Sequence, residues 1–104
     1  MSVLLEFAMF PTDKGESVSA YVSQIIAMIR DSGMDYQLTP MGTIVETEEL
    51  DQATDLVNKA YAVLDQAGCS RVYASLKLDI RKGQSGRINA KVNSIQNKIG
   101  RVDT

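Results

Sequence analysis

Residues 34–47 read MDYQLTPMGTIVET, and this stretch decides how the rest of the chain is interpreted. Two runs with strand character, Met34–Met41 and Thr43–Thr47, meet around Pro40-Met41-Gly42. Proline limits the pairing of a strand and glycine permits a turn or a bulge, so the stretch is predicted to form a β-hairpin. A helical pattern lies on each side of this hairpin, and a strand pattern lies beyond each helix.

The helical patterns on the two sides of the hairpin are both amphipathic. Before the hairpin, from about Ser17, apolar residues recur at helical spacing until Gly33, which is expected to end the helix. These residues are Val18, Tyr21, Val22, Ile25, Ile26 and Ile29. After the hairpin, Thr47 is expected to cap a second helix that ends at Gly68. The buried stripe of that helix is predicted to consist of Ala53, Leu56, Val57, Ala60 and Leu64.

Two strand patterns lie outside these helices. Val3–Phe10 alternates with period two, and because its second set of residues is also mostly apolar, both faces are expected to be covered. Pro11–Gly15 is predicted to be a loop. Val72–Ile80 alternates between apolar and polar residues, which predicts a strand with one polar face. After a turn at residues 82–86, a short third helix is expected to carry the apolar stripe Ile88, Val92, Ile95 and Ile99.

The predicted order is therefore βαββαβ followed by a helix, in one domain that spans residues 1–104. Right-handed crossovers would place both main helices on one face of a four-stranded antiparallel sheet, which is an α+β architecture. The other face would display apolar and polar side chains together: Leu4, Ala8 and Phe10 beside Glu6, Tyr73 and Lys77. Such a face is too apolar to be fully exposed to solvent and too polar to form a fully buried core, so burial against another subunit or a ligand is expected.

The composition narrows the classes of function. With 44% hydrophobic and 23% charged residues, the 104-residue chain has the composition of an ordinary globular protein. It has no histidine, and so lacks both the usual general base and the commonest nitrogen ligand of metals. The single cysteine, Cys69, cannot form an internal disulfide and is expected to be a packing residue. Met1–Glu6 has no basic region and no long apolar run follows, which predicts a cytoplasmic protein that neither enters a membrane nor is exported.

No motif in the sequence supports catalysis. There is no phosphate-binding loop, dinucleotide fingerprint, cysteine pair or nucleophile elbow. Acylphosphatases share the element order, but their phosphate-binding loop needs an arginine, and Pro11–Ser17 offers only Lys14. RNA-recognition modules share it too, but they need several aromatic residues and a basic platform, whereas this chain offers Tyr73 and a pI of about 5.0. We therefore expect no catalytic residue, no metal site and no nucleic-acid partner.

Charge is divided unevenly along the chain. Up to Ser70 there are three basic and eleven acidic residues, a net charge of −8, whereas from Arg71 onward there are eight basic and two acidic residues, a net charge of +6. These halves either attract each other between subunits or mix into an ordinary surface within one fold, and the sequence leaves both possibilities open.

Three carboxylates, Glu6, Glu46 and Asp79, lie inside strand patterns. An acid that is buried there without a partner is strongly unfavourable. Each of the three is therefore either solvated or paired with a basic residue across the sheet, or it accepts hydrogen bonds from a cationic or amine-bearing ligand.

Several segments together resemble a known family, the small thiamine-binding proteins related to YkoF. They are residues 17–22 (SVSAYV), residues 36–43 (YQLTPMGT) with Glu46 after them, Arg71-Val72-Tyr73, and Leu78-Asp79-Ile80-Arg81. The Pro-Met-Gly-Thr segment at residues 40–43 is the most specific of these, and the resemblance covers nearly the whole chain.

The resemblance implies a ferredoxin-like fold and homo-oligomers, dimers or tetramers, that bind thiamine or its hydroxymethylpyrimidine part near a subunit interface without turnover. By motif position and chemistry, the expected ligand-binding residues are Ser19, Tyr21, Thr43 and Glu46. An acid, hydroxyls and apolar walls suit a ligand with a thiazolium cation and a flat aminopyrimidine. Two alternatives stay open: a module that senses an amino acid or another metabolite, and a structural interaction subunit without a ligand.

Overall fold

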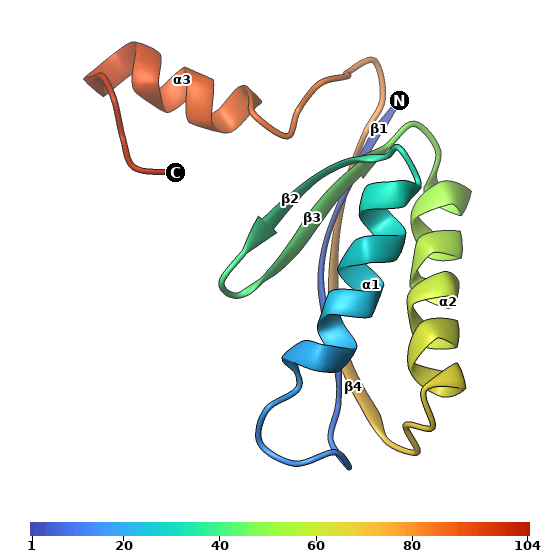
Figure 1. Ribbon diagram of the computed structural model, residues 1–104. Coiled ribbons are helices and arrows are strands. Elements are labelled where there is room, and N and C mark those ends of the chain that lie inside the picture. Colours follow the sequence, from blue (N-terminus) through green and yellow to red (C-terminus); the bar gives the residue numbers. More distant parts are fainter.

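The computed structural model describes residues 1–104, in which four strands and three helices follow one another (Figure 1). Their order is β1 (Ser2–Pro11), α1 (Ser19–Asp31), β2 (Asp35–Thr39), β3 (Gly42–Thr47), α2 (Leu50–Gln66), β4 (Val72–Arg81) and α3 (Ala90–Ile99). The predicted βαββαβ order with an added C-terminal helix is confirmed.

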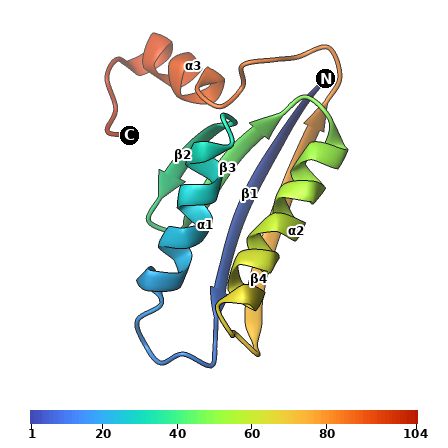
Figure 2. The same ribbon diagram turned by 45° about the vertical axis from the view of Figure 1, so that its right-hand side comes forward.

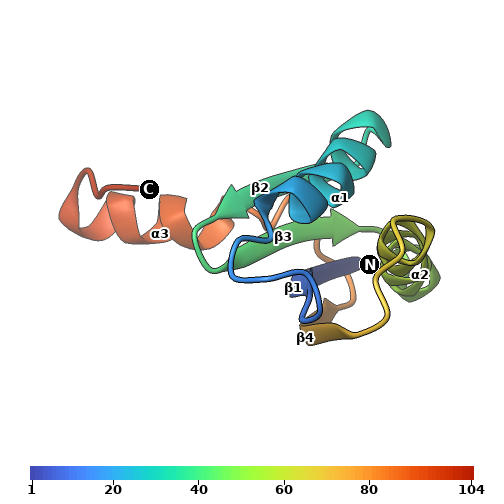
Figure 3. The same cartoon turned by 60° about the horizontal axis from the view of Figure 1, so that its bottom comes forward.

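The strands form one antiparallel sheet in the order β2-β3-β1-β4. The central strand β1 pairs with β3 from Val3↔Thr47 to Phe7↔Thr43, and with β4 along its whole length. Figures 1 and 3 show α1 and α2 side by side on one face of this sheet. The architecture is the expected α+β, ferredoxin-like one.

The hydrophobic core lies between the sheet and these two helices. Alternation along β1 sends Val3, Leu5, Phe7 and Met9 into it, each at most 6% exposed. The helices contribute the buried residues Ile25, Ile29, Ala53, Leu56, Ala60 and Leu64. The amphipathic patterns read from the sequence therefore identify the correct buried faces of α1 and α2. No helix packs against the second face of β1, where Leu4, Ala8 and Phe10 stay half-buried within one chain.

Two local predictions are corrected. Thr47 does not cap α2: the N-cap is Glu49, in a capping box where Gln52 Oε1 accepts a hydrogen bond from the Glu49 N–H at 2.9 Å. Thr47 instead donates its hydroxyl proton to the Glu49 carbonyl. Pro11 belongs to β1 and not to the following loop, because its missing N–H costs nothing at the last position of a strand.

The loop after β1 is fastened to the turn before β4. The Ser70 backbone N–H and hydroxyl donate hydrogen bonds to Asp13 Oδ2 at 2.8 and 2.6 Å. These bonds stabilise the charged form, and so they lower the pKa of Asp13 from 3.8 to about 2.

The C-terminal third of the chain departs most from expectation. The apolar residues of β4 are not covered, since Leu76, Leu78 and Ile80 are each 46% exposed. Helix α3 has no buried residue and stands away from the sheet as an arm (Figures 1 and 2). The molecule is accordingly elongated, with extents of 46 × 29 × 22 Å. None of the three helices has the length and apolar character that a membrane span needs.

Candidate functional site

A cavity of about 310 Å³ lies between α1, the second half of β1 and the β2-β3 hairpin. Of its 14 lining residues, 10 are hydrophobic. The lining consists of Phe7, Ala8, Met9, Phe10, Val18, Val22, Ile25, Ile26, Leu38, Thr39, Pro40, Met41, Gly42 and Thr43. The volume is at the lower end of the range for small-molecule sites, and suits about one heteroaromatic ring system.

Helical spacing brings the α1 wall of this cavity together. Val18, Val22 and Ile25 follow one another at intervals of four and three residues, so they lie on one side of the helix axis. Ile26 widens the same stripe toward the hairpin. The apolar pattern that predicts α1 thus supplies both the core, through Ile25 and Ile29, and one wall of the cavity.

Gly42 sets how closely the hairpin approaches β1. A Cβ atom at this position would lie 3.0 Å from the Phe7 carbonyl oxygen, which is too short for an unstrained contact. The Thr39 hydroxyl closes the turn, donating to the Gly42 carbonyl at 2.8 Å and accepting from the Gly42 N–H at 3.1 Å. The Pro-Met-Gly-Thr segment therefore has a physical role. Its glycine lets the β2-β3 hairpin approach β1 closely, so that these two elements form adjoining walls of the cavity.

The cavity has few polar groups and no charged side chain. The Thr39 hydroxyl is occupied by the turn. Thr43 is 4% exposed, its hydroxyl takes part in no hydrogen bond of the chain, and no side-chain polar atom is fully buried without a partner. The Thr43 hydroxyl is therefore free to donate to, or accept from, a bound molecule.

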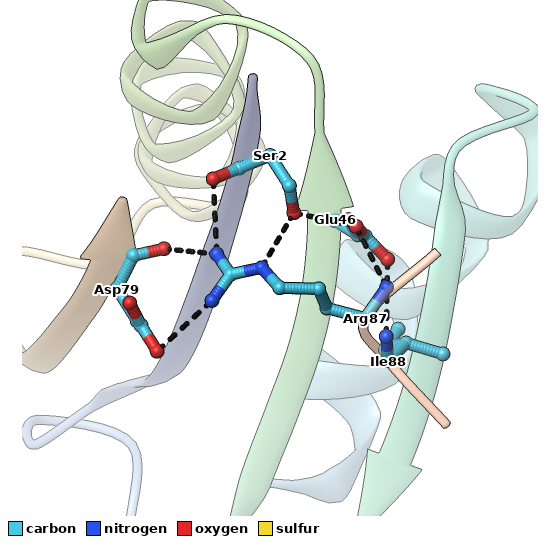
Figure 4. Close-up of polar contacts among 5 residues, drawn as sticks. All are labelled: Ser2, Glu46, Asp79, Arg87 and Ile88. Carbon is cyan, nitrogen blue, oxygen red and sulfur yellow. Dashed lines mark hydrogen bonds and ion pairs between the residues drawn. The ribbon is translucent and has the colours of Figure 1, made fainter. Parts of the chain in front are cut away.

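Glu46 lies in a different place, a polar cluster at the base of the α3 arm (Figure 4). Its Oε2 accepts hydrogen bonds from the Ser2 hydroxyl at 2.6 Å and the Arg87 N–H at 3.0 Å, and its Oε1 accepts one from the Ile88 N–H at 3.1 Å. The Arg87 guanidinium continues the cluster, donating to Ser2 Oγ and the Ser2 carbonyl, each at 2.9 Å. It also pairs with the Asp79 carboxylate at 3.1 Å.

Two opposing effects act on the pKa of Glu46. Burial favours the neutral acid, but the donors from Arg87, Ser2 and Ile88 together outweigh it and lower the pKa below the ordinary value of 4.5. Glu46 is thus a carboxylate whose acceptor capacity is already largely used inside the chain. Of the alternatives left open by the sequence, the geometry favours structural pairing over ligand binding.

A second cavity, of about 430 Å³, lies next to this cluster and is mostly polar. Glu46 lines it together with Asp35, Glu48 and Gln52, but only 2 of its 10 lining residues are hydrophobic. It offers no apolar wall for an aromatic ring. No group of three or more histidine, cysteine, aspartate or glutamate side chains is placed to hold a metal ion.

The four ligand-binding residues predicted from the sequence do not come together. Thr43 lines the apolar cavity, whereas Glu46, three positions along β3, points to the opposite face of the sheet, since side chains alternate along a strand. Ser19 is exposed at the first turn of α1, and Tyr21 packs against the core. Neither of the two lines the cavity.

The residues that the sequence analysis missed are the apolar wall itself. The sequence pattern assigns Val18, Val22 and Ile26 only to the buried stripe of a helix, and Leu38 to a strand. The available signal is the helical spacing of Val18, Val22 and Ile25, which sets them on one side of α1.

Comparison with known proteins finds relatives over nearly the whole chain. The family model described as thiamine-binding protein matches residues 5–96, which include the whole lining of the apolar cavity. A UPF0045 protein of Methanothermobacter thermautotrophicus is 35% identical over 83 residues, 80% of this chain and 84% of the relative. A UPF0045 protein of Mycobacterium tuberculosis is 32% identical over 103 residues, 99% of this chain and 100% of the relative.

Solved structures share the fold. A domain of unknown function from Bacillus cereus matches with a TM-score of 0.80 at 28% identity, covering 94% of this chain and 93% of that chain. A Thermotoga maritima protein assigned provisionally to thiamine biosynthesis or salvage matches with a TM-score of 0.78 at 24% identity, covering 91% of this chain and 99% of its own. The second likeness is one of fold only.

Proposed function

Because this chain belongs to the thiamine-binding protein family, we propose that it binds thiamine, or the hydroxymethylpyrimidine half of it, in the apolar cavity without converting it chemically. The observation that carries this proposal is the position of the Pro-Met-Gly-Thr segment, residues 40–43, in the cavity wall. The most specific motif of the sequence and the most suitable cavity of the structure thus coincide.

The chemistry of the cavity suits the pyrimidine half of thiamine. A flat aromatic ring gains from burial against walls such as Val22, Ile26 and Leu38. The free Thr43 hydroxyl can bond a ring nitrogen or the exocyclic amine. A thiazolium cation would be unfavourable inside, because no lining residue is charged, and it would therefore lie at the open mouth where water solvates it.

The same lining disfavours an amino-acid ligand. A zwitterion carries two charges, and burying them without charged partners is costly.

The lining of the cavity also supports binding without turnover, since none of the 14 lining residues is an acid, a base or an activated nucleophile.

We keep a homo-oligomer, dimer or tetramer, as part of the proposal. The half-buried residues of the open sheet face and the exposed Ile99 of α3 lack cover in one chain.

Calorimetric titration with separate halves of the ligand tests the proposal. Thiamine and hydroxymethylpyrimidine are expected to bind, and hydroxyethylthiazole and free amino acids are not. At a ligand concentration 100 times Kd, binding should raise the free energy of unfolding by about 2.7 kcal/mol, which a thermal-shift measurement detects. Binding of amino acids, or of no compound in the panel, would overturn the proposal in favour of the sensor or the structural alternative.

A pair of phenylalanine variants locates the site. Val22→Phe fills part of the cavity and is expected to weaken thiamine binding by about tenfold or more, because the ring's volume is taken. Gln24→Phe adds the same side chain at an exposed position of α1 and should leave affinity unchanged. Recovery of unchanged thiamine after incubation with the wild-type protein tests the absence of turnover.

A further inference from the structure

The β2-β3 hairpin places two strongly exposed apolar side chains in the lining of the apolar cavity. Leu38 is 60% exposed and Met41 is 88% exposed, yet both line the cavity. Each therefore lies at the rim, in contact with both the cavity and the solvent. A molecule that enters the cavity must pass these two side chains and cover part of their surface.

The backbone at Met41 is held by the turn. Thr39 Oγ1 accepts hydrogen bonds from the Met41 N–H at 3.3 Å and from the Gly42 N–H at 3.1 Å, and the Thr39 hydroxyl donates to the Gly42 carbonyl. Pro40, directly before Met41, adds the restricted φ angle of a proline. The Met41 side chain therefore starts from a fixed point, and a change in its chemistry is felt at the rim of the cavity.

Met41 is also the most exposed of the sulfur-bearing residues. The chain has five methionines and one cysteine, and Met1 follows Met41 at 39% exposed. An oxidant dissolved in water therefore reaches Met41 most readily. The other four are buried or partly buried against the core: Met9, Met28, Met34 and Cys69.

We propose that Met41 is a redox-sensitive modification site, and that its oxidation to the sulfoxide by hydrogen peroxide weakens ligand binding in the apolar cavity. The Met41 sulfur attacks one oxygen of the peroxide, the O–O bond breaks, and a proton passes to the leaving hydroxide, so that one sulfoxide and one water form. The sulfur is oxidised by two electrons, and the peroxide is reduced by two. The effect on binding rests on the proposed function, because it requires the ligand to occupy this cavity.

A sulfoxide changes the rim because it is polar where the thioether is apolar. Its oxygen is a hydrogen-bond acceptor that water solvates. The lining has no charged side chain to replace that water, and the Thr39 hydroxyl is occupied by the turn. A flat ring that covers the sulfoxide removes water from it without a compensating bond, and we expect binding to weaken by about fivefold.

Mass spectrometry after graded peroxide treatment tests the site itself and needs no ligand. Trypsin releases residues 31–59 as one peptide that contains both Met34 and Met41, so its fragment ions compare the two positions directly. The sulfoxide should appear at Met41 at a lower peroxide concentration than at Met34. Equal oxidation of both positions, or earlier oxidation of Met34, would overturn the assignment of Met41 as the modified residue.

Calorimetric titration with hydroxymethylpyrimidine tests the consequence for binding. This probe has no thiazolium cation, whose attraction to the sulfoxide oxygen would oppose the expected loss. Peroxide is removed by gel filtration before each titration. The Kd of the oxidised wild type should be about fivefold higher than that of the untreated protein, and treatment with methionine sulfoxide reductases A and B should restore it.

Two variants separate Met41 from the other sulfur atoms. Met41→Leu keeps an apolar side chain and leaves every other methionine and Cys69 in place, so its own Kd should be the same before and after peroxide treatment. Met41→Gln has a polar side chain of similar length and should show weaker binding than Met41→Leu without any peroxide. An equal loss of affinity on oxidation in the wild type and in Met41→Leu would overturn the proposal, because the damage would then lie at another sulfur.

The outcomes also separate this proposal from the proposed function. If the untreated wild type binds neither thiamine nor hydroxymethylpyrimidine, the proposed function fails, and the effect of oxidation on binding fails with it. If the untreated wild type binds hydroxymethylpyrimidine and the protein oxidised at Met41 binds it with the same Kd, the proposed function stands and only the role of Met41 is overturned.

Discussion

Thr43 and Glu46 are three residues apart on β3, and they serve different regions of the molecule. Thr43 faces the helices, where it offers a free hydroxyl to an apolar cavity. Glu46 faces the other way, where three donors within the chain hold its carboxylate and fix the root of the α3 arm. The cavity therefore offers a hydroxyl that is free to bond a ligand, whereas the polar groups of the cluster already bond one another.

The difference teaches that the type of a residue is a weaker guide to a site than the face on which it lies. A carboxylate suits a cationic ligand in principle, but hydrogen bonds already formed by that carboxylate must be broken before it can bind one. The region with uncommitted groups is the better candidate. Substitutions in one of the two regions should therefore leave the other unchanged.

Removal of the Arg87 side chain should have the largest effect. Its guanidinium joins Ser2 and Asp79, and the side chain is only 9% exposed. Arg87→Ala leaves these partners without their donors and is expected to lower the free energy of unfolding by about 2–4 kcal/mol. Denaturant titration measures this, with Arg101→Ala, at an exposed residue after α3, as the control. Thiamine affinity should stay constant, and a large loss of affinity in a folded Arg87→Ala protein would show that the two regions are coupled.

Substitution of Gly42 should come next and should affect the cavity. The added methyl group of Gly42→Ala would meet the Phe7 carbonyl oxygen at 3.0 Å, so the hairpin must move away from β1. We expect a loss of about 1–3 kcal/mol in the free energy of unfolding and weaker thiamine binding. Met41→Ala, at a neighbouring residue that is 88% exposed, should change stability little. A Gly42→Ala protein with wild-type stability would mean that the close approach is unimportant.

Glu46→Gln should have a smaller effect that depends on pH. An amide cannot receive all the donors that the carboxylate receives, so the variant should lose about 1–2 kcal/mol of stability at neutral pH. Because the pKa of Glu46 is lowered in the folded state, its contribution to the free energy of unfolding is fully present above pH 4.5. This contribution is lost as the pH falls through the folded-state pKa. The difference between the melting temperatures of the two proteins should therefore shrink as the pH is lowered from 7 to 3. A difference that stays constant over this range would exclude an ionised Glu46 as its source.

Much of the fold follows from local patterns in the sequence. Alternation along β1 and the apolar stripe of α2 identify buried faces correctly, because both depend only on the geometry of a strand or a helix. The turn at Pro40-Met41-Gly42 follows from residue chemistry in the same way. Period two along β3 also separates Thr43 from Glu46, so their opposite faces could have been predicted.

The remaining features depend on contacts between distant segments. Glu46 meets the Arg87 N–H 41 positions away, and no periodicity indicates that the loop after β4 folds back over β1 and β3. The pair of Lys77 with Glu6, at 3.8 Å, also shows that part of the basic C-terminal charge meets acids of the N-terminal part of the same chain. The exposed row on β4 could not be foreseen either, since its alternation is that of any covered strand, and only the position of α2 reveals that nothing covers it.

The central claim is that the ligand occupies the Thr43 side of β3 and not the Glu46 side, and calorimetric titration of thiamine into two variants tests it most directly. Thr43→Val keeps the volume and removes the hydroxyl, and it should weaken binding about fivefold, the effect of one lost hydrogen bond. Glu46→Gln should bind with the affinity of the wild type, although it is less stable. Wild-type affinity in Thr43→Val together with a loss of tenfold or more in Glu46→Gln would contradict the assignment and place the ligand at the polar cluster.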